Sequence, residues 1–288
     1  MPIRRGGSIN DALSTYLEAS KSKTVLVGPL EKYLLLNPEP NNRRTDVLHP
    51  SETVSDWWCP RYAQMVIEGV IPVKPEKHRL RMQSIFAEGH AIHKKWQDWL
   101  GSMGALYGIW RCEACGEQAW SLGRPIDLCQ HGAACITYDE VPLSDGLWSG
   151  HADGIVEFSH RSTSSLLEIK SVGTGTIRWG NPSLLDGNDL SDAFSKISQP
   201  FDNHIRQIQI YMELTQRMYR AGDPEIHPVE DCIVIYECKS DQAVKEFVVK
   251  RDSSYIVDIL EYADEMETLV GTGKFIACPF RECKHDHD

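Results

Sequence analysis

The sequence lacks long hydrophobic runs, internal repeats and low-complexity tracts. No run of about 18 apolar residues is present, so we expect no membrane-spanning helix and no membrane partner. The opening residues, Met-Pro-Ile-Arg-Arg-Gly-Gly-Ser, are not followed by an apolar segment. We therefore expect no secretory signal and a cytoplasmic location.

An excess of positive charge is also missing. The 288 residues carry a formal net charge of −11, so the overall charge does not indicate a nucleic-acid-binding protein. Such a partner is still compatible with this charge, because a local basic groove or a bound cation offsets carboxylates. The 41% hydrophobic and 25% charged residues are typical of a globular protein that buries its own core.

Hydrophobic periodicity predicts an α/β protein. Helical spacing of apolar residues favours helices at 8–20, 82–100, 201–220 and 254–270, and alternation favours strands at 147–158, 165–172, 231–239 and 244–250. A further helix is expected to begin at Ser51 and to end near Pro60, with Trp57 and Trp58 on it. Residues 173–200 have little periodicity and are expected to form a long loop.

Five segments differ in character along the chain. We expect an N-terminal helix and linker, a helical part of the main domain, a cysteine-rich insert, the core of the domain and a tail with cysteine and histidine, at 1–48, 49–107, 108–138, 139–274 and 275–288. The chain is long enough for one large domain with an insert.

Three charged residues lie on the two strands predicted around residues 147–172. Side chains alternate along a strand, so Glu168 and Lys170 share one face. With a turn near Arg161, Asp153 is expected opposite Lys170 on the partner strand. Two carboxylates, together with the Ile169 carbonyl, are ligands suited to Mg²⁺ or Mn²⁺. The Lys170 ammonium would hold or deprotonate a water for attack on phosphorus.

The same three residues would also form an ordinary cross-strand salt bridge, which is the commoner meaning of such a pattern. Further residues favour the metal site. His93 lies on the apolar stripe of the helix predicted at 82–100, whereas Lys94 and Lys95 are expected to face outward. Gln207 and Tyr211 lie four residues apart on one face of another predicted helix.

Taken together and in this order, these elements resemble the RecB-like branch of the PD-(D/E)xK nuclease superfamily, in particular the RecB-type exonucleases of phages and CRISPR adaptation systems. The matching pairs are Gly89 with His93, Gly150 with Asp153, Glu168 with Lys170, and Gln207 with Tyr211. The resemblance implies that His93, Asp153 and Glu168 bind the metal and that Lys170 is catalytic. It also implies that Gln207 and Tyr211 position the substrate or the loops of the site.

The resemblance further implies a fold and a function. The fold is a restriction-endonuclease-like α/β core, a mixed central sheet flanked by helices, here with an inserted zinc-ribbon-like knuckle. The function is a metal-dependent DNA exonuclease at single-stranded or duplex ends, in recombination, repair or phage DNA metabolism, with recombination or replication proteins as partners. The alternatives are a nuclease-fold scaffold without activity that recruits partners, and a structure-specific endonuclease. The location implied is the cytoplasm of a bacterium or of a phage-infected host.

Nine cysteines are many for a chain expected in a reducing compartment, where clustered cysteines are typical of metal sites. Cys112 and Cys115 have the spacing of half a zinc knuckle, and Cys129 follows. We expect Cys135 to be the fourth ligand of a structural Zn²⁺, with His131 in reserve. Four cysteines in a loop without metal are the alternative.

A second cysteine site is suggested by the same resemblance. RecB-like nucleases with an iron–sulfur cluster use one cysteine before the nuclease motifs and three near the C-terminus. Cys59 matches the first position, and Cys278 and Cys283 match two of the others. The third C-terminal cysteine is missing, although His285 follows closely. A [4Fe–4S] cluster, a second zinc ion and an empty site all remain open.

Two residues after the second predicted strand are candidates for contact with DNA. Arg178 would bind a phosphate, and Trp179 would stack on an unpaired base. The alternative is that Trp179 packs on the core.

Overall fold

The computed structural model describes residues 25–38, 43–73, 78–280 and 283. Two compact units are distinguished, and each is considered by itself: the first comprises 1–43 and 74–88, and the second 44–73 and 89–288. Among its described residues, the first unit contains helix α2 (Val27–Leu36), which has no buried residue, and the beginning of helix α5 (Leu80–Ser102). The helix predicted at 8–20 lies outside the described residues.

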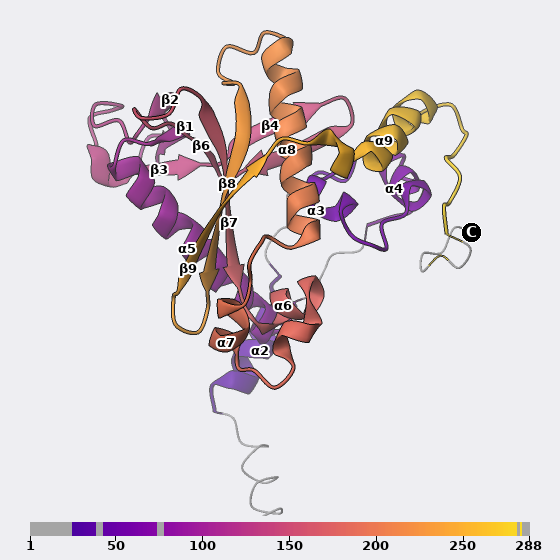
Figure 1. Cartoon of the computed structure of the whole chain (residues 1–288), viewed down its shortest axis with the longest axis horizontal. Coiled ribbons are helices and arrows are strands. Elements are labelled where there is room, and N and C mark those ends of the chain that lie inside the picture. The colour runs from indigo at the N-terminus through magenta and orange to yellow at the C-terminus, as the bar shows by residue number, and fades with distance from the viewer. Residues whose placement is uncertain (1–24, 39–42, 74–77, 281–282, 284–288) are drawn as a thin grey trace, which may run out of the picture. The chain divides into compact units, whose positions relative to one another are not determined.

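The second unit is built around a seven-stranded sheet (Figure 1). Its strands are β1 (Leu106–Cys112), β2 (Gln118–Leu122), β3 (Ile136–Asp139), β6 (Gly154–Val156), β7 (Ser164–Val172), β8 (Val229–Cys238) and β9 (Val244–Lys250). Their order is β2-β1-β6-β7-β8-β9, with β3 also paired to β1. Strands β7 and β8 are parallel and the other pairs are antiparallel, which confirms the predicted mixed sheet.

Helices cover both faces of this sheet. The alternating apolar residues of β7 point to opposite sides: Leu166 packs with Ile208 of helix α8 (Asp202–Arg220), and Leu167 packs with Ile92 of α5. All four side chains are buried. The charged positions of β7 therefore lie on the face that α8 covers. The strands predicted at 231–239 and 244–250 correspond to β8 and β9 and are confirmed.

A two-stranded hairpin precedes β6. It consists of β4 (Val141–Asp145) and β5 (Trp148–Ala152), joined by a tight turn with Gly146 at φ 53°. The predicted strand 147–158 is therefore not continuous. It breaks at Asp153, where β5 pairs with β4 and β6 joins the main sheet.

This break corrects the predicted register. Gly154 pairs with Leu167, so Asp153 lies next to Glu168 in the register instead of opposite Lys170. The chain turns near Phe158, where the N–H of Arg161 donates to the Phe158 carbonyl over 2.9 Å. A shift of two residues keeps Asp153 on the expected face of the sheet, because side-chain direction repeats every two residues.

Other predicted elements are corrected as well. The helix expected from Ser51 to Pro60 is two helices, α3 (Pro50–Thr53) and α4 (Pro60–Ile67), with Trp57 and Trp58 between them. Pro60 begins α4, a position where the missing N–H of proline has no intrahelical partner to lose.

The segment 173–200 is likewise not a long loop. It contains helices α6 (Thr174–Gly180) and α7 (Leu190–Ser195), and Asp189 caps the second by accepting from the N–H of Asp192. The predicted C-terminal helix is α9 (Val257–Leu269).

Strand β1 belongs to both the cysteine-rich segment and the main sheet. Its first residues pair with β6, and its last residues pair with β3. The five predicted segment boundaries stay predictions. No helix of the described residues combines the length and the hydropathy that a bilayer crossing requires.

Candidate metal centre

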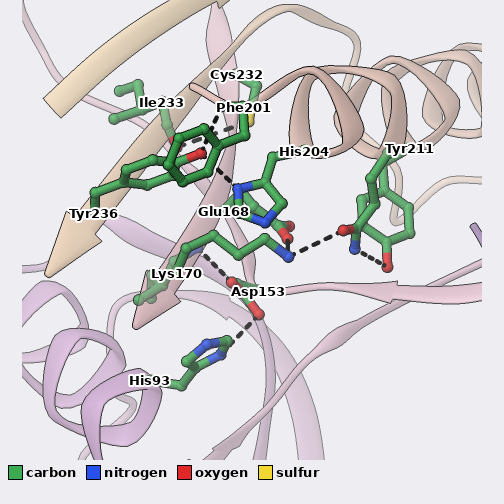
Figure 2. A network of polar contacts seen from close by, with 12 residues as sticks. His93, Asp153, Glu168, Lys170, Phe201, His204, Tyr211, Cys232, Ile233 and Tyr236 are labelled. Carbon is green, nitrogen blue, oxygen red and sulfur yellow. Dashed lines mark hydrogen bonds and ion pairs between the residues drawn. The ribbon is translucent and has the colours of Figure 1, made fainter. Parts of the chain in front are cut away.

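Asp153 lies between β5 and β6 and makes three polar contacts. Its Oδ1 lies 3.1 Å from His93 Nδ1 (Figure 2), and its Oδ2 accepts from the N–H of Ile169 over 2.5 Å. The backbone carbonyl of Asp153 accepts from the Gln97 amide over 3.1 Å. Helix α5 therefore fixes both the carboxylate and the backbone of Asp153, through residues one helical turn apart.

His93 reaches the site as the helical stripe predicted. Burial lowers the pKa of His93, but the hydrogen bond and the charge of Asp153 outweigh it, and the pKa is raised. Metal ligands at about 2.1 Å and at right angles are separated by about 3.0 Å. The distance between Asp153 Oδ1 and His93 Nδ1 is 3.1 Å, so the two atoms are spaced as two ligands of one ion.

Glu140 is the ligand candidate that the sequence analysis missed. Side-chain ligand atoms of His93, Glu140 and Asp153 all lie within 4.8 Å of one another. Glu140 directly precedes β4, and Val141 pairs with Ala152 in the antiparallel β4–β5 hairpin. The next position of the same register places Glu140 opposite Asp153. The signal was Gly146, the first residue of a two-residue turn that pairs Asp145 with Trp148 and so sets this register.

Crowding of carboxylates affects Glu140 and Glu168. Removal of water by the surrounding protein, together with the charge of Asp153, raises the pKa of Glu140 to about 7. Burial raises the pKa of Glu168 to about 7, although Lys170 opposes this shift. Carboxyl groups that resist ionisation beside one another form a site that a divalent cation stabilises. The residues present therefore fit such an ion.

The Ile169 carbonyl points toward this site. Within a strand, the N–H and C=O of one residue point to the same neighbouring strand. The N–H of Ile169 donates to Asp153, which places the carbonyl of Ile169 on the side of β6 and not of β8. Strand β6 begins at Gly154, which pairs with Leu167, so no β6 residue lies opposite this carbonyl.

Glu168 and Lys170 form a buried ion pair on β7. The Lys170 Nζ lies 2.6 Å from Glu168 Oε1 and donates to Gln207 Oε1 over 3.0 Å. Gln207 in turn donates to the Tyr211 hydroxyl over 3.1 Å. Burial lowers the pKa of Lys170, but the Glu168 carboxylate outweighs it and raises the pKa. The Lys170 side chain therefore stays in its protonated, positively charged form.

The predicted ligand Glu168 lies apart from the group that His93 and Asp153 form. The group of mutually close ligand atoms contains Glu140 and not Glu168, whose carboxylate pairs with Lys170 instead. Glu168 lies on the face of Lys170, as the strand alternation predicted, and its ion pair with Lys170 agrees in part with the salt-bridge alternative. Binding of the ion by Glu168 stays a prediction.

His204 completes the surroundings of Lys170 and was also missed. It lies on the α8 face that carries Gln207 and Tyr211, at positions i, i+3 and i+7. The Nδ1 of His204 lies 2.5 Å from the Tyr236 hydroxyl (Figure 2). Burial, with the nearby charge of Lys170, lowers the pKa of His204 well below its usual value. The neutral ring adds no second positive charge beside Lys170.

The two candidates for DNA contact lie on α6, which follows β7. Both Arg178 and Trp179 are exposed, and Trp179 retains 84% of its accessible surface. Trp179 therefore does not pack on the core, which was the alternative. Their contact with DNA stays a prediction.

The cysteine-rich segment brings four possible ligands together, with one change from the prediction. The group consists of Cys112, Cys115, Cys129 and His131, and Cys135 lies outside it. Cys135 ends a short 3-10 helix, and its carbonyl accepts from the N–H of Glu113 over 2.8 Å. This contact holds the backbone of Cys135 beside the turn, and its sulfur is not among the four close ligand atoms.

The second cysteine site is partly assembled. Sulfur atoms of Cys59, Cys278 and Cys283 lie within 4.8 Å of one another, and those of Cys59 and Cys278 are 3.5 Å apart. Burial raises the pKa of Cys59 to about 12. His285, the remaining predicted ligand, lies outside the described residues. Among the described residues, these three sulfur atoms would supply three of the four ligands that a [4Fe–4S] cluster needs.

Comparisons with known proteins give only weak likenesses. The chain matches no family model and no curated protein. The crystal structure of SSO0001 is 15% identical, with 88% of this chain and 90% of that chain covered and a TM-score of 0.37. LHK-Exo in complex with dAMP is 14% identical, with 79% and 91% covered and a TM-score of 0.41.

The structure of an alkaline exonuclease, LHK-Exo from Laribacter hongkongensis, is 12% identical, with 80% and 92% covered and a TM-score of 0.42. Likenesses at this level carry no argument about fold or activity.

Proposed function

We propose that this protein is a nuclease that depends on a divalent metal and hydrolyses phosphodiester bonds of DNA. One observation carries the proposal. Strand β7, helix α5 and the β4–β5 hairpin bring a histidine, three carboxylates and a protonated lysine to one place, although these residues are far apart in the sequence. An ordinary salt bridge would need only Glu168 and Lys170, which are neighbours on β7.

The ligands suit Mg²⁺ or Mn²⁺. Asp153, Glu140 and His93 would hold the ion, with the Ile169 carbonyl and Glu168 as further oxygen donors. When bound, such an ion polarises a phosphoryl oxygen and makes a bound water more acidic. The hydrogen bond and the charge of Asp153 raise the pKa of His93 against the effect of burial, and the same negative charge would attract a metal cation.

Lys170 has a different task from the ligands. Because its pKa is raised, the ammonium is suited to orient a nucleophilic water and to neutralise charge that develops on the phosphate. This favours holding the water over deprotonating it, the two roles that the sequence left open. Gln207 accepts from the ammonium and is itself fixed by Tyr211, so the position of Lys170 is set from helix α8.

Two finer parts of the proposal rest on the resemblance of the motifs to the RecB-like branch. The first is that the mixed sheet with α5 and α8 is a restriction-endonuclease-like core. The second is that cleavage is exonucleolytic, at single-stranded or duplex ends, in recombination, repair or phage DNA metabolism. Exposed Arg178 and Trp179 are the proposed contacts to the strand.

Digestion of DNA labelled at its 5′ or 3′ end, with Mn²⁺ or Mg²⁺, tests the proposal. Wild type is compared with Lys170→Ala, Asp153→Asn and Lys196→Ala, purified in parallel. Lys196 is exposed and donates only to Asn188, so its variant is the matched lysine control. We expect cleavage by wild type and Lys196→Ala, and none by the other two.

Thermal unfolding of each variant separates loss of chemistry from loss of fold. Asp153→Asn is the decisive variant, because it removes a charged ligand at constant side-chain volume. Equal cleavage by wild type and Lys170→Ala would contradict the site. A folded wild type without cleavage of any DNA end would favour the scaffold alternative, and internal cuts in circular DNA would favour the endonuclease alternative.

A further inference from the structure

The four ligand candidates of the cysteine-rich segment have the spacing of a tetrahedral metal site. Zn²⁺ binds sulfur at about 2.3 Å and nitrogen at about 2.0–2.1 Å, so tetrahedral S and N ligands are separated by about 3.6 Å. His131 Nδ1 lies 3.6 Å from Cys129 Sγ and 3.8 Å from Cys112 Sγ. All four ligand atoms lie within 4.8 Å of one another.

The first arm of the site is a turn that presents two sulfur atoms. Gly116 donates its N–H to the Cys112 carbonyl, and Cys112 donates its own N–H to the Glu117 carbonyl, each over 2.8 Å. Gly116 has φ 78°, a left-handed conformation that favours glycine and lets the chain turn back directly after Cys115. The turn is closed by backbone hydrogen bonds and needs no side-chain packing.

Backbone N–H groups of the same turn reach the first sulfur atom. The N–H groups of Ala114 and Cys115 donate to the Cys112 sulfur. Cysteine binds metal as the thiolate, which accepts hydrogen bonds of this kind.

The second arm has no hydrophobic core of its own. Between Arg124 and Cys135 only Leu128 packs on the neighbouring core, where it is partly buried, and Ile126 retains 79% of its accessible surface. Cys129 and His131 are joined by a turn that ends at Gly132, again left-handed at φ 77°. A segment with so little packing needs a cross-link to order it. The cysteines of this segment form no disulfide, so a metal ion is the cross-link that they can provide.

We propose that Cys112, Cys115, Cys129 and His131 bind one structural Zn²⁺. Four protein ligands close the coordination sphere, which is typical of a structural and not of a catalytic zinc site. Three thiolates and one imidazole also favour zinc over the hard cations expected at the carboxylate site. The ion fastens the loop between β2 and β3 to the end of β1, the strand that continues into the main sheet through β6. This inference does not depend on the proposed nuclease activity.

Metal analysis of matched variants tests the ligand set. Zinc is measured by mass spectrometry in the purified full chain for wild type, Cys115→Ser, His131→Ala and Cys135→Ser. We expect Cys115→Ser to contain about one equivalent less zinc than wild type, and Cys135→Ser to contain as much as wild type. His131→Ala is expected to lose its zinc to a chelator faster than wild type. Any metal bound at Cys59, Cys278 and Cys283 is present in all four proteins, so it does not contribute to the difference in zinc content between a variant and wild type.

Cobalt substitution tests the geometry without any mutation. Wild type refolded with Co²⁺ is expected to show sulfur-to-cobalt charge-transfer bands and the strong visible absorption of a tetrahedral site. His131→Cys should keep the ion and shift these bands, because a sulfur replaces the nitrogen, whereas Cys135→Ser should leave them unchanged. Equal zinc in wild type and Cys115→Ser, loss of zinc in Cys135→Ser, or iron in place of zinc would each overturn the proposal.

Discussion

Lys170 Nζ donates to Gln207 Oε1 over 3.0 Å, which links the central strand β7 to helix α8. The Nε2 of Gln207 donates to the Tyr211 hydroxyl, so the orientation of the Gln207 amide is fixed. With the amide turned around, its N–H₂ group would face the ammonium and repel it. Gln207 and Tyr211 thus act on the site through Lys170.

Replacement of Gln207 should therefore impair catalysis more than replacement of Tyr211. Gln207→Met keeps the side-chain volume but removes the acceptor for the ammonium, a hydrogen bond worth about 1.5–3 kcal/mol. We expect kcat for DNA cleavage to fall about 10- to 100-fold, with little change in KM. Tyr211→Phe leaves Gln207 Oε1 in place, so its effect should be smaller. Steady-state kinetics that ranked the two variants in the opposite order would contradict this arrangement.

Gly150 should be required because the Tyr211 ring packs directly against it. A Cβ at Gly150 would lie 2.8 Å from Cε1 of Tyr211 and 3.1 Å from Cδ of Pro50. Gly150→Ala is expected to destabilise the protein by about 1–3 kcal/mol in urea unfolding and to reduce cleavage by displacing the ring. Gly89→Ala is the control, because the nearest atom to its Cβ would be Ser171 Oγ at 3.5 Å, an ordinary contact. Its stability should equal or exceed that of wild type, because alanine favours a helix.

The elements with strong local periodicity were predictable from the sequence. Helices α5 and α8 and strand β7 carry His93, Gln207, Glu168 and Lys170, and each of these side chains faces the side that its periodicity indicated. Here the position of a side chain follows from its own element, so no long-range information was needed.

The parts that depend on pairing between elements could not be predicted in the same way. Glu140 joins the site only because the β4–β5 register sets it beside Asp153. His131 lies in the group of close ligand atoms and Cys135 lies outside it, with its carbonyl bonded to the N–H of Glu113. Both placements involve backbone hydrogen bonds between segments, which periodicity does not report.

Lys95 is a further case, since it was expected to face solvent and instead pairs with Glu237. The Glu237 carboxylate is 2% exposed and also accepts from the Trp96 indole over 2.7 Å. Lys95→Met would leave a buried charge without its cation, so we expect a loss of about 3–5 kcal/mol in the free energy of unfolding. Lys94→Met, at the neighbouring exposed position, removes only a surface pair with Asp98 and should cost about 0.5 kcal/mol or less.

The double variant Lys95→Met/Glu237→Gln decides whether the buried charge is the cause. A glutamine still accepts from Trp96 but carries no charge, so the double variant should be more stable than Lys95→Met alone. Urea unfolding at fixed ionic strength measures all of these variants. If the double variant lost as much unfolding free energy as Lys95→Met and Glu237→Gln lose together, Lys95 would act through packing of its aliphatic chain and not through Glu237.

Asp231 should make the free energy of unfolding decrease at acidic pH. Its side chain is fully buried, with Arg161 at 2.7 Å, Lys250 at 2.8 Å and the Ser165 hydroxyl at 2.5 Å. Burial raises the pKa of Asp231, but hydrogen bonds from Lys250, Ser165 and Arg161 outweigh it and lower the pKa. A lowered pKa in the folded state stabilises the protein above the unfolded pKa of about 3.9, and the stabilisation is lost as pH falls through the folded value.

Asp231→Asn should therefore be less stable than wild type at neutral pH, by about 1.5–3 kcal/mol for the lost charged hydrogen bonds. The difference between the two proteins should shrink as the pH falls below about 4, because wild type then loses the same stabilisation by protonation. Urea unfolding across this pH range gives the difference in unfolding free energy between Asp231→Asn and wild type. The other carboxylates are the same in both proteins, so their contribution cancels in this difference. Asp264→Asn, at an exposed position of α9, is the control and should follow wild type at every pH. A difference between Asp231→Asn and wild type that stayed constant from neutral to acidic pH would mean that the carboxylate contributes through its shape and not through its charge.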